Sequence, residues 1–351
     1  MLRSLRRLTT AGLRNLGAFH LIGNSPWRQK RLLILCYHGV SLEDEHQWKP
    51  FLYLTPQKLE QRFSILKQKG YSVLPLAEGL QRLRTGTLPP RSVVLTFDDG
   101  NYDFFQQAYP LLGRYGFPAT VYQSTYYTAL ELPIFHQICS YMFWQRRGQL
   151  ISEVQSLGLQ APLDLRTESS RIASVRALID LADRENRSGR QKDELAQKLA
   201  GVLKIDYALL KTKRIAQLMN GSELREITNN GIDVQLHTHR HRMPEDEALF
   251  RKEIQDNRAS IQQLTGTAPV HFCYPSGVYG AAFLPWLQKE GIVSATTCDV
   301  GLAGRRSELL LLPRFIDHQN RTEVDFESWI SGVGDLLAVR RKAKQAVAPG
   351  R

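Results

Sequence analysis

Hydrophobic and polar positions along the chain follow two alternating patterns. Short runs of β-branched and aliphatic residues predict strands, and most are followed by stretches with apolar residues three and four positions apart, typical of amphipathic helices. The predicted strands are 31–38, 92–99, 119–124, 232–239, 271–275 and 293–298. Near-continuous apolar runs such as VVL in SVVLTFDD indicate strands buried on both faces, as in a parallel sheet or barrel. The order of elements predicts an α/β fold of repeated strand and helix units.

Helical spacing is clearest in residues 55–71 and 104–116, and Gly70 and Gly116 are the expected helix stops. Residues 131–219 depart from this rhythm, because they hold charged, helix-prone stretches and no strand candidate. We interpret them as a helical insertion that either packs against the barrel or acts as a lid or substrate-specificity element. The predicted organisation has three parts, which are a basic segment at 1–30, a barrel with its insertion at 31–335, and a basic tail at 336–351.

Composition supports a globular chain with a sizeable core, since 42% of its 351 residues are apolar and 23% are charged. The formal charge of +12 is concentrated at the two ends, and the middle is nearer to balance, so nucleic-acid binding is not expected. Leucines beside arginines near the N-terminus indicate either peripheral contact with an anionic membrane surface or a solvated basic helix packed on the barrel. The terminal cations are Arg3, Arg6, Arg7, Arg14, Arg28, Lys30, Arg31, Arg340, Arg341, Lys342 and Lys344.

Targeting signals are weak in this sequence. No stretch approaches the roughly 18 uninterrupted apolar residues of a membrane span, and the stretch NLGAFHLIGNSPW after the basic start is too polar to serve well as a signal peptide. We therefore expect the cytoplasm or the cytoplasmic membrane surface. The four scattered cysteines show no CxxC spacing, so neither a disulfide framework nor a cysteine zinc site is predicted.

Two adjacent carboxylates, Asp98 and Asp99, end the predicted strand 92–99 and are followed by Gly100, which permits a tight turn. Active sites of parallel barrels gather at the carboxyl ends of the strands. One aspartate could bind a metal while the other accepts a proton. The alternative is a structural turn or a helix N-cap, which aspartate often forms.

Three histidines follow another predicted strand in the stretch QLHTHRH. Neutral imidazole is the commonest protein ligand for zinc-like ions, and two histidines with one carboxylate leave coordination positions open for water and substrate. His237 could pair with His239 on one strand face, or with His241 if the chain turns after Thr238. A solvated basic surface is the alternative, and spacing alone does not decide between these cases.

Taken together, these motifs resemble the polysaccharide deacetylases of carbohydrate esterase family 4, which carry the NodB homology domain. TFDDG at 96–100 matches the first family motif, and HTHRH at 237–241 matches its His-Ser/Thr-x-x-His motif. FCYPSG at 272–277 is similar to the third motif, and LCYHGV at 35–40 is similar to the strand that opens many members. The resemblance covers roughly residues 31–330 without the insertion.

The resemblance implies a distorted (β/α)7, TIM-like barrel. It implies a hydrolase that removes N-acetyl groups from a polysaccharide or glycan containing N-acetylhexosamine, cleaving carbon–nitrogen bonds of linear amides other than peptide bonds. It also implies one divalent ion, with zinc favoured and cobalt, manganese and iron as alternatives. A catalytically silent glycan-binding module on the same barrel is the alternative function. Tyr126, Tyr127 and Tyr279 could stack on sugar rings, although most such aromatics serve packing.

By motif position, the resemblance assigns Asp98 as the general base and leaves His239 at a variable position. The backbone N–H of Tyr274 is expected to stabilise the oxyanion, and Thr238 is expected to order the histidine loop by hydrogen bonding. The implied metal ligands are Asp99, His237 and His241.

The sequence departs from the family pattern in two places. Cys273 stands where many members have an arginine that braces the catalytic aspartate, and Arg314 in LLPRFID is a candidate replacement, because guanidinium binds carboxylate through two hydrogen bonds. The general acid is usually a histidine after a late strand. His318 in FIDHQN lies near that place but matches poorly, and His38 in CYHGV is a second candidate.

Overall fold

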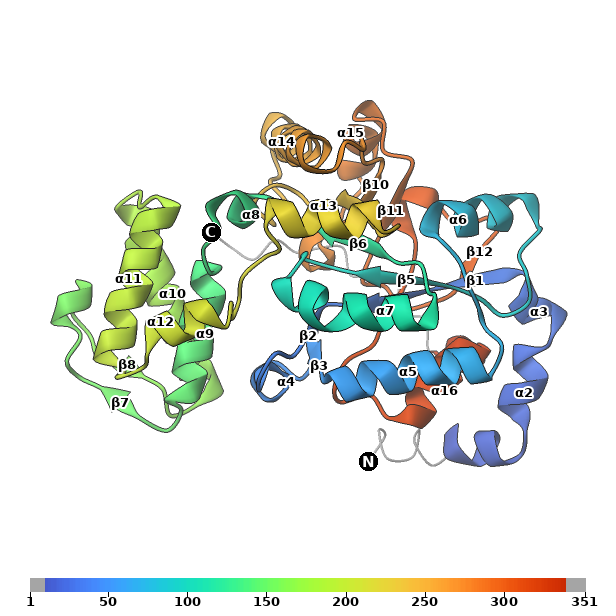
Figure 1. Cartoon of the computed structure of the whole chain (residues 1–351), viewed down its shortest axis with the longest axis horizontal. Helices are drawn as coiled ribbons and strands as arrows, with labels where there is room; N and C mark the ends of the chain where they lie inside the picture. Colours follow the sequence, from blue (N-terminus) through green and yellow to red (C-terminus); the bar gives the residue numbers. More distant parts are fainter. Residues whose placement is uncertain (1–9, 339–351) are drawn as a thin grey trace.

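The computed structural model describes residues 10–338, and its centre is a curved parallel sheet (Figure 1). All the predicted strands are present, and they are hydrogen-bonded in the order β11-β10-β9-β6-β5-β1. Their bounds are β1 Arg31–Tyr37, β5 Ser92–Phe97, β6 Thr120–Gln123, β9 Asp233–Leu236, β10 His271–Cys273 and β11 Ser294–Thr296. The α/β class expected from the alternation of elements is confirmed.

A short late segment joins the two ends of this sheet. Leu312 forms a parallel bridge with Thr296 of β11, and β13 (Phe315–Ile316) pairs in parallel with Leu35 and Cys36 of β1. The distorted, TIM-like barrel is therefore confirmed, and residues 312–316 complete it. Four minor strands extend the sheet or flank it. They are β4 (Ser72–Val73) beside β5, β12 (Ala303–Gly304) antiparallel to β1, and the pair β2 (Gly39–Val40) and β3 (Tyr53–Leu54).

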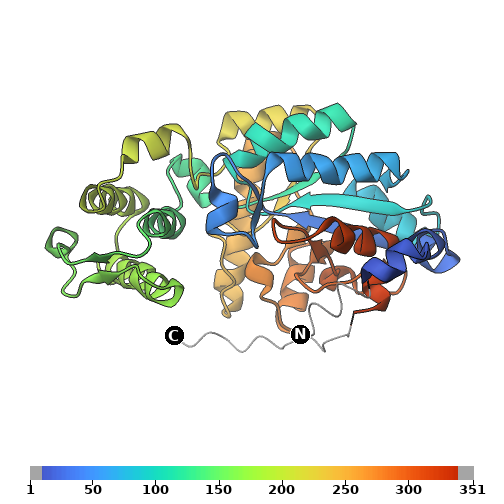
Figure 2. The ribbon, with the colours of Figure 1, turned by 90° about the horizontal axis from the view of Figure 1, so that it is seen from below.

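Helices cover the outside of the barrel, as Figures 1 and 2 show from two directions. The first predicted helix is α5, which ends just before Gly70, and the second is α7, which follows a π-helical turn at Phe104–Ala108 and ends at Gly116 in left-handed conformation. The outer helices are α5 Pro56–Gln68, α6 Leu76–Thr85, α7 Tyr109–Tyr115, α13 Gly221–Asn229, α14 Glu247–Thr265, α15 Phe283–Lys289, α16 Glu323–Ser331 and α17 Val333–Leu336.

Alternation along the strands decides which side chains reach the barrel interior. Leu33, Leu35 and Tyr37 of β1 pack outward into the main apolar core, as do Val93, Leu95 and Phe97 of β5. Because successive side chains on a strand point to opposite faces, the intervening positions point inward. The inward side chains at the carboxyl ends of the strands are Cys36, Asp98, His237 and Cys273, so four separated segments present polar groups to one place.

Residues 131–219 form a lobe of helices beside the barrel in both views (Figures 1 and 2). Its helices are α9 Phe135–Gln145, α10 Glu168–Arg184, α11 Gly189–Val202 and α12 Tyr207–Thr212. They enclose their own apolar cluster, which includes Ile138, Phe143, Leu178 and Leu199. The expectation that this segment holds no strand is wrong in one detail, because β7 (Leu150–Ile151) and β8 (Leu163–Asp164) form a short antiparallel pair.

The N-terminal part of the described chain packs against the barrel through α2 (Ala18–Gly23) and α3 (Pro26–Gln29). Arg14 pairs with Glu323 at 2.6 Å and Glu327 at 2.5 Å, while fully buried Arg28 donates to three backbone carbonyls. These two cations therefore stabilise the fold. Lys30 and Arg31 are also among the described residues, whereas the cations at positions 3, 6 and 7 and those of the C-terminal tail lie outside them. Among residues 10–338, no helix is both long and apolar enough to cross a bilayer.

Candidate active site

Asp98 and Arg314 form a buried ion pair in the barrel interior. Nη1 and Nη2 of Arg314 lie 2.7 Å from Oδ1 and Oδ2 of Asp98, so the guanidinium grips both carboxylate oxygens. The remaining donors of Arg314 reach the Thr297 carbonyl at 2.9 Å, the Thr96 hydroxyl at 3.3 Å and the Cys273 sulfur at 3.1 Å. Arg314 is thus fully hydrogen-bonded, as a buried charge requires. It lies where the sequence-based hypothesis for Asp98 needed a cation.

The surroundings of Asp98 keep it ionised. Burial by itself raises the pKa of this carboxyl, but the charge of Arg314 and its hydrogen bonds outweigh burial and hold the pKa well below its usual range. The thiols of Cys36 and Cys273 also point at Oδ2, at 3.5 and 3.4 Å. Burial raises the pKa of both thiols, so they remain protonated, weak donors to the carboxylate.

Asp99, His237 and His241 converge on one point at the mouth of the barrel. Oδ1 of Asp99 lies 3.3 Å from Nε2 of His237 and 3.2 Å from Nε2 of His241. These three ligand atoms form a compact group of the kind that holds a metal ion. Bonds of about 2.0–2.1 Å to a tetrahedral ion place neighbouring ligand atoms about 3.3 Å apart. The donor spacing therefore fits a zinc-sized ion.

The tautomer of His237 supports the same interpretation. Nδ1 of His237 lies 2.9 Å from the backbone carbonyl oxygen of Cys273, which can only accept a hydrogen bond, so Nδ1 carries the proton. Nε2 of the neutral ring then presents a lone pair towards the Asp99 carboxylate. Two acceptors at this distance require a cation between them or a further proton. Anchoring of the outer ring nitrogen in this way is typical of metal-binding histidines.

Three residues of this site have a left-handed backbone conformation. Asp99, Thr238 and His241 all have positive φ angles, of 72°, 60° and 54°. Such conformations cost non-glycine residues on the order of 1 kcal/mol or more each, and they cluster at functional sites. They turn Asp99 and His241 towards each other although both follow a strand end. Thr238 stabilises its turn by accepting a hydrogen bond from the Arg242 N–H at 3.1 Å.

Two buried residues of α14 hold the histidine loop, and the sequence analysis missed both. Asn257 accepts a hydrogen bond from the His237 N–H at 2.9 Å. Glu253 accepts hydrogen bonds from Arg240 at 2.8 and 3.0 Å and from Arg242 at 2.9 Å. The sequence could have indicated them through the helical period, because both are polar residues on the apolar face of α14, which also carries Phe250, Ile254 and Ile261. Buried polar residues at such positions indicate a hydrogen-bonding role.

The two candidate proton donors lie in different surroundings. Nε2 of His38 lies 3.7 Å from Oδ2 of Asp98, at the same carboxyl edge of the barrel as Asp99, His237 and His241. His318 instead packs against the Phe51 ring, with centroids 5.2 Å apart, and accepts a hydrogen bond from the Asn320 N–H at 3.2 Å. Among the described residues, none of its contacts is with Asp98 or Asp99. The structure therefore supports His38 in preference to His318.

The expectation for Tyr274 is not met. Its N–H donates to the Thr296 carbonyl at 3.2 Å as part of the pairing between β10 and β11, so it is not free for an oxyanion. Its ring belongs to the outward apolar core, and its hydroxyl donates to the Leu310 carbonyl at 3.0 Å. Tyr279 packs against this ring, with centroids 5.7 Å apart, and pairs with Asp299. Tyr274 is therefore structural, because strand alternation turns position 274 away from the barrel interior.

A cleft of about 400 Å³ opens beside Asp99 and His241. Tyr126 and Tyr127 of α8 (Tyr126–Leu130) line it, together with His239, the histidine that the motif leaves at a variable position. His239 is held by the Thr125 hydroxyl, which lies 2.9 Å from Nδ1. The metal-ligand group thus borders a space with sugar-sized aromatic surfaces nearby.

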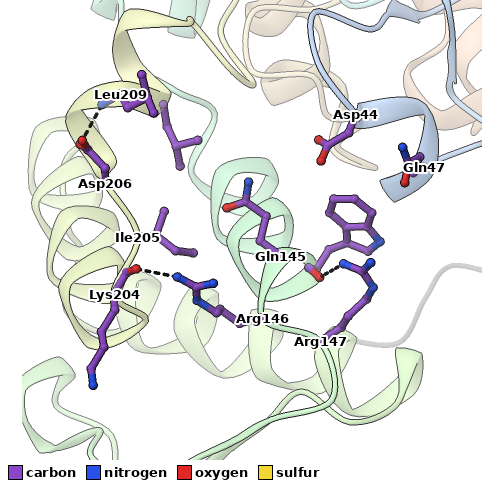
Figure 3. Close-up of a pocket in the computed structure, with 11 residues that line it drawn as sticks. Asp44, Gln47, Gln145, Arg146, Arg147, Lys204, Ile205, Asp206 and Leu209 are labelled. Atoms are coloured by element: carbon purple, nitrogen blue, oxygen red, sulfur yellow. Dashed lines mark hydrogen bonds between the residues drawn. The ribbon is translucent and has the colours of Figure 1, made fainter.

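A second hollow of about 470 Å³ lies where the insertion meets α4 (Glu45–Trp48), and Figure 3 shows its lining. Asp44 and Gln47 face it from the barrel side. Arg146 donates to the carbonyls of Leu203 and Lys204 at 2.7 and 2.6 Å, and therefore closes the end of α11. No strand-end side chain of the described barrel lines this hollow, so it is not the candidate site.

Known proteins share the barrel and its motifs. Residues 85–138 and 207–295 match the family model described as polysaccharide deacetylase. The poly-β-1,6-N-acetyl-D-glucosamine N-deacetylase of Escherichia coli (strain K12) is 32% identical over 100 residues, which are 28% of this chain and 15% of the relative. The chain thus matches less than a third of the length of this curated relative.

Solved structures show the same fold. A Streptococcus pyogenes deacetylase, PplD, solved in complex with acetate, is similar with a TM-score of 0.56 and 19% identity, over 84% of this chain and 96% of that one. IcaB from Ammonifex degensii is similar with a TM-score of 0.53 and 15% identity, over 87% and 97%.

The chain thus combines a parallel barrel with an aspartate clamped by an arginine, beside a group of one carboxylate and two histidines that could hold a metal ion. The match to the family model over residues 85–138 and 207–295, together with the E. coli relative, shows that these parts of the chain are similar to polysaccharide deacetylases. The matched segments stop on either side of residues 139–206, so most of the helical insertion is not part of the shared domain.

Proposed function

We propose that this protein removes acetyl groups from N-acetylhexosamine residues of a glycan, by hydrolysis of the acetamido bond. One observation carries the proposal. Asp98 is held ionised by Arg314 immediately next to Asp99, which converges with His237 and His241 at the same edge of the barrel. A proton acceptor and a group of potential metal ligands are therefore side by side at the carboxyl edge of the barrel, an arrangement suited to metal-assisted hydrolysis of an amide.

One divalent ion, zinc in the first instance with cobalt, manganese and iron as alternatives, would be held by Asp99, His237 and His241. When bound there, it would polarise the acetyl carbonyl and lower the pKa of water. The chain's own residues would transfer the protons and orient the reacting groups. Asp98 accepts the proton of the attacking water, and Arg314 keeps its carboxylate oriented by gripping both oxygens. His38 donates a proton to the nitrogen of the leaving amine.

Cys273 stands in place of the family arginine, and the lack of that arginine would favour the alternative, a silent glycan-binding module. Arg314 occupies that space from a different segment and lies 3.1 Å from the Cys273 sulfur. The guanidinium that the motif lacks is thus supplied by the tertiary structure. Binding of glycan without release of acetate remains the outcome that would identify a silent module.

Acetate release tests the proposal directly. The purified protein, with and without added zinc, is incubated with β-1,6-linked oligomers of N-acetylglucosamine, the repeat of the polymer named for the E. coli relative, and with β-1,4-linked oligomers. We expect acetate release to require metal. Asp98→Asn should abolish the release without loss of bound ion, and the control Arg258→Lys, which alters a pair with Glu290, should leave it unchanged. Absence of release from every oligomer by the zinc-loaded protein would refute the proposed activity.

A further inference from the structure

The cleft beside Asp99 has walls from two different parts of the chain. The barrel contributes Asp99 and His241, and the helical insertion contributes Gln137 of α9, Asp183 of α10 and Lys192 of α11. An acetamido group at the metal ligands would fill only a small part of the space of about 400 Å³. The rest of the cleft runs towards the insertion.

We infer that the insertion binds the sugar residue adjacent to the one that loses its acetyl group, so that the protein acts on chains in preference to single sugars. This inference rests on the proposed function, and it concerns residues that the family model does not cover, Asp183 and Lys192 among them. The ligand class is a neutral N-acetylated oligosaccharide.

Paired charges in the cleft favour a neutral ligand over an anion. Lys192 Nζ lies 2.7 Å from Asp183 Oδ1, and the two side chains are 24% and 61% exposed. Sugar hydroxyls donate and accept hydrogen bonds at once, and this pair offers them an acceptor and a donor side by side. Arg240 and Arg242 at the other wall share the carboxylate of Glu253, and Arg240 also lies 3.8 Å from Asp256, so their charge is partly compensated.

Backbone hydrogen bonds fix the insertion to the loop that follows the two aspartates. The Met219 N–H donates to the Gly100 carbonyl at 3.0 Å, and the Tyr102 N–H donates to the Gln217 carbonyl at 2.9 Å. At the other end of the insertion, the Ile134 N–H donates to the Ala216 carbonyl at 2.8 Å. The segments that enter and leave the lobe are therefore joined to each other and to the catalytic turn.

Close packing at Gly189 sets the position of α11 relative to α8. A Cβ atom at Gly189 would lie 2.4 Å from Cδ1 of Leu130 and 3.3 Å from the hydroxyl oxygen of Tyr126. A side chain at position 189 would have to displace the end of the Leu130 side chain, and this close approach brings the first turns of α11, with Lys192, next to a tyrosine that lines the cleft. Two independent sets of contacts thus hold the insertion as a wall of the cleft.

The dependence of deacetylation on chain length tests this inference. The readout is the ratio of kcat/KM for the β-1,6-linked N-acetylglucosamine tetramer to that for the monosaccharide. We expect a ratio of at least about tenfold in the wild type, and a fall of about fivefold in Lys192→Ala and in Gln137→Ala. The matched controls are Lys198→Ala on an exposed part of α11 and Gln145→Ala on the same helix as Gln137, and both are expected to keep the wild-type ratio.

Gly189→Ala provides a second variant, because its added Cβ would press on the Leu130 side chain at the contact between α11 and α8 without removing a polar group. We expect it to lower the tetramer to monomer ratio in the same way. A wild-type ratio near one, or equal losses for both lengths in Lys192→Ala and Gln137→Ala, would overturn the inference while leaving the deacetylase activity in place.

Calorimetric binding to the Asp98→Asn protein separates the two proposals. If the wild type releases no acetate, the proposed function fails. The inference is still supported if the Asp98→Asn protein binds the tetramer more tightly than the monosaccharide and if Lys192→Ala removes this difference. Equal binding of both sugars would refute the wall as well. Binding needs no catalysis, so this measurement decides the inference in either case.

Discussion

The guanidinium of Arg314 grips the carboxylate of Asp98 through two hydrogen bonds of 2.7 Å, although the residues are 216 positions apart in the chain. Removing either partner would leave a charge buried in the barrel. Nη2 of Arg314 also contacts the sulfur of Cys273, the residue at the motif position of the family arginine. Asp98, the proposed base, is therefore held by a residue that directly precedes β13, whereas Cys273 of β10 contributes only a thiol.

Arg314→Lys tests the brace through the pH dependence of the reaction. An ammonium group cannot span both oxygens, and burial, which raises the pKa of Asp98, is then opposed less strongly. The base must be deprotonated, so the acid limb of kcat/KM moves to higher pH, and kcat/KM at neutral pH falls by about tenfold or more. The control is Arg258→Lys, which alters a pair with Glu290. An acid limb in the same place as in the wild type would contradict this role.

Moving the arginine to the family position tests whether Arg314 replaces it in space. Arg314→Ala leaves Asp98 charged and unpaired, which should lower the free energy of unfolding by about 3 kcal/mol. Adding Cys273→Arg to that variant should recover part of the stability and of the acetate release. Cys273→Arg alone should destabilise the protein by about 1–3 kcal/mol, because Arg314 already fills the space. Denaturant unfolding measures all three, and a double variant no better than Arg314→Ala would disprove the replacement.

Substitution of the two candidate acids distinguishes between them. His38→Gln should lower kcat by about 100-fold or more, the usual contribution of a general acid, while metal content stays unchanged. His318→Gln should keep kcat within a fewfold of the wild type, because His318 contacts Phe51 and Asn320. Equal losses in the two variants would reject His38 as the acid.

His318 should instead affect the pH dependence of stability. Burial lowers the pKa of His318 to about 4 from 6.5. The unfolded chain therefore binds more protons between these values, and stability present above pH 6.5 is lost as the pH falls towards 4. Between pH 7 and pH 5, His318→Gln should reduce the loss in the free energy of unfolding by on the order of 1 kcal/mol. The free energy of unfolding of both proteins is measured by urea titration at each pH. If it falls equally with pH in the two proteins, the prediction is wrong.

Metal binding should stabilise the folded protein, since Asp99, His237 and His241 converge only in the native fold. At a free zinc concentration of about 100 Kd, mass action adds about 2.7 kcal/mol. We expect the Tm to rise on adding zinc and to return to its starting value with a chelator. Asp98→Asn should retain this shift, and Asp99→Ala or His241→Ala should lose it. A shift that survives both ligand substitutions would place the ion elsewhere.

The sequence by itself determined the strands, the polar residues at their ends and the class of fold. Hydrophobic periodicity is local, so β1, β5, β6, β9, β10 and β11 could be predicted from short windows. The rule that active sites lie at the carboxyl ends of parallel strands then selected Asp98, Asp99 and the histidines without any contact being known. Arg314 could be named as a candidate partner of Asp98, but its contact with both carboxylate oxygens could not be predicted.

The tertiary structure decided which of these residues meet. Tyr274 lost its expected role because its N–H is used in the sheet, a fact set by the register of β10 against β11. Asn257, Glu253 and the wall formed by Lys192 depend on where whole helices pack, which no local pattern encodes. Distances between segments hundreds of positions apart arise only when the barrel closes, and for that reason the partners of Asp98 and the second wall of the cleft required the fold.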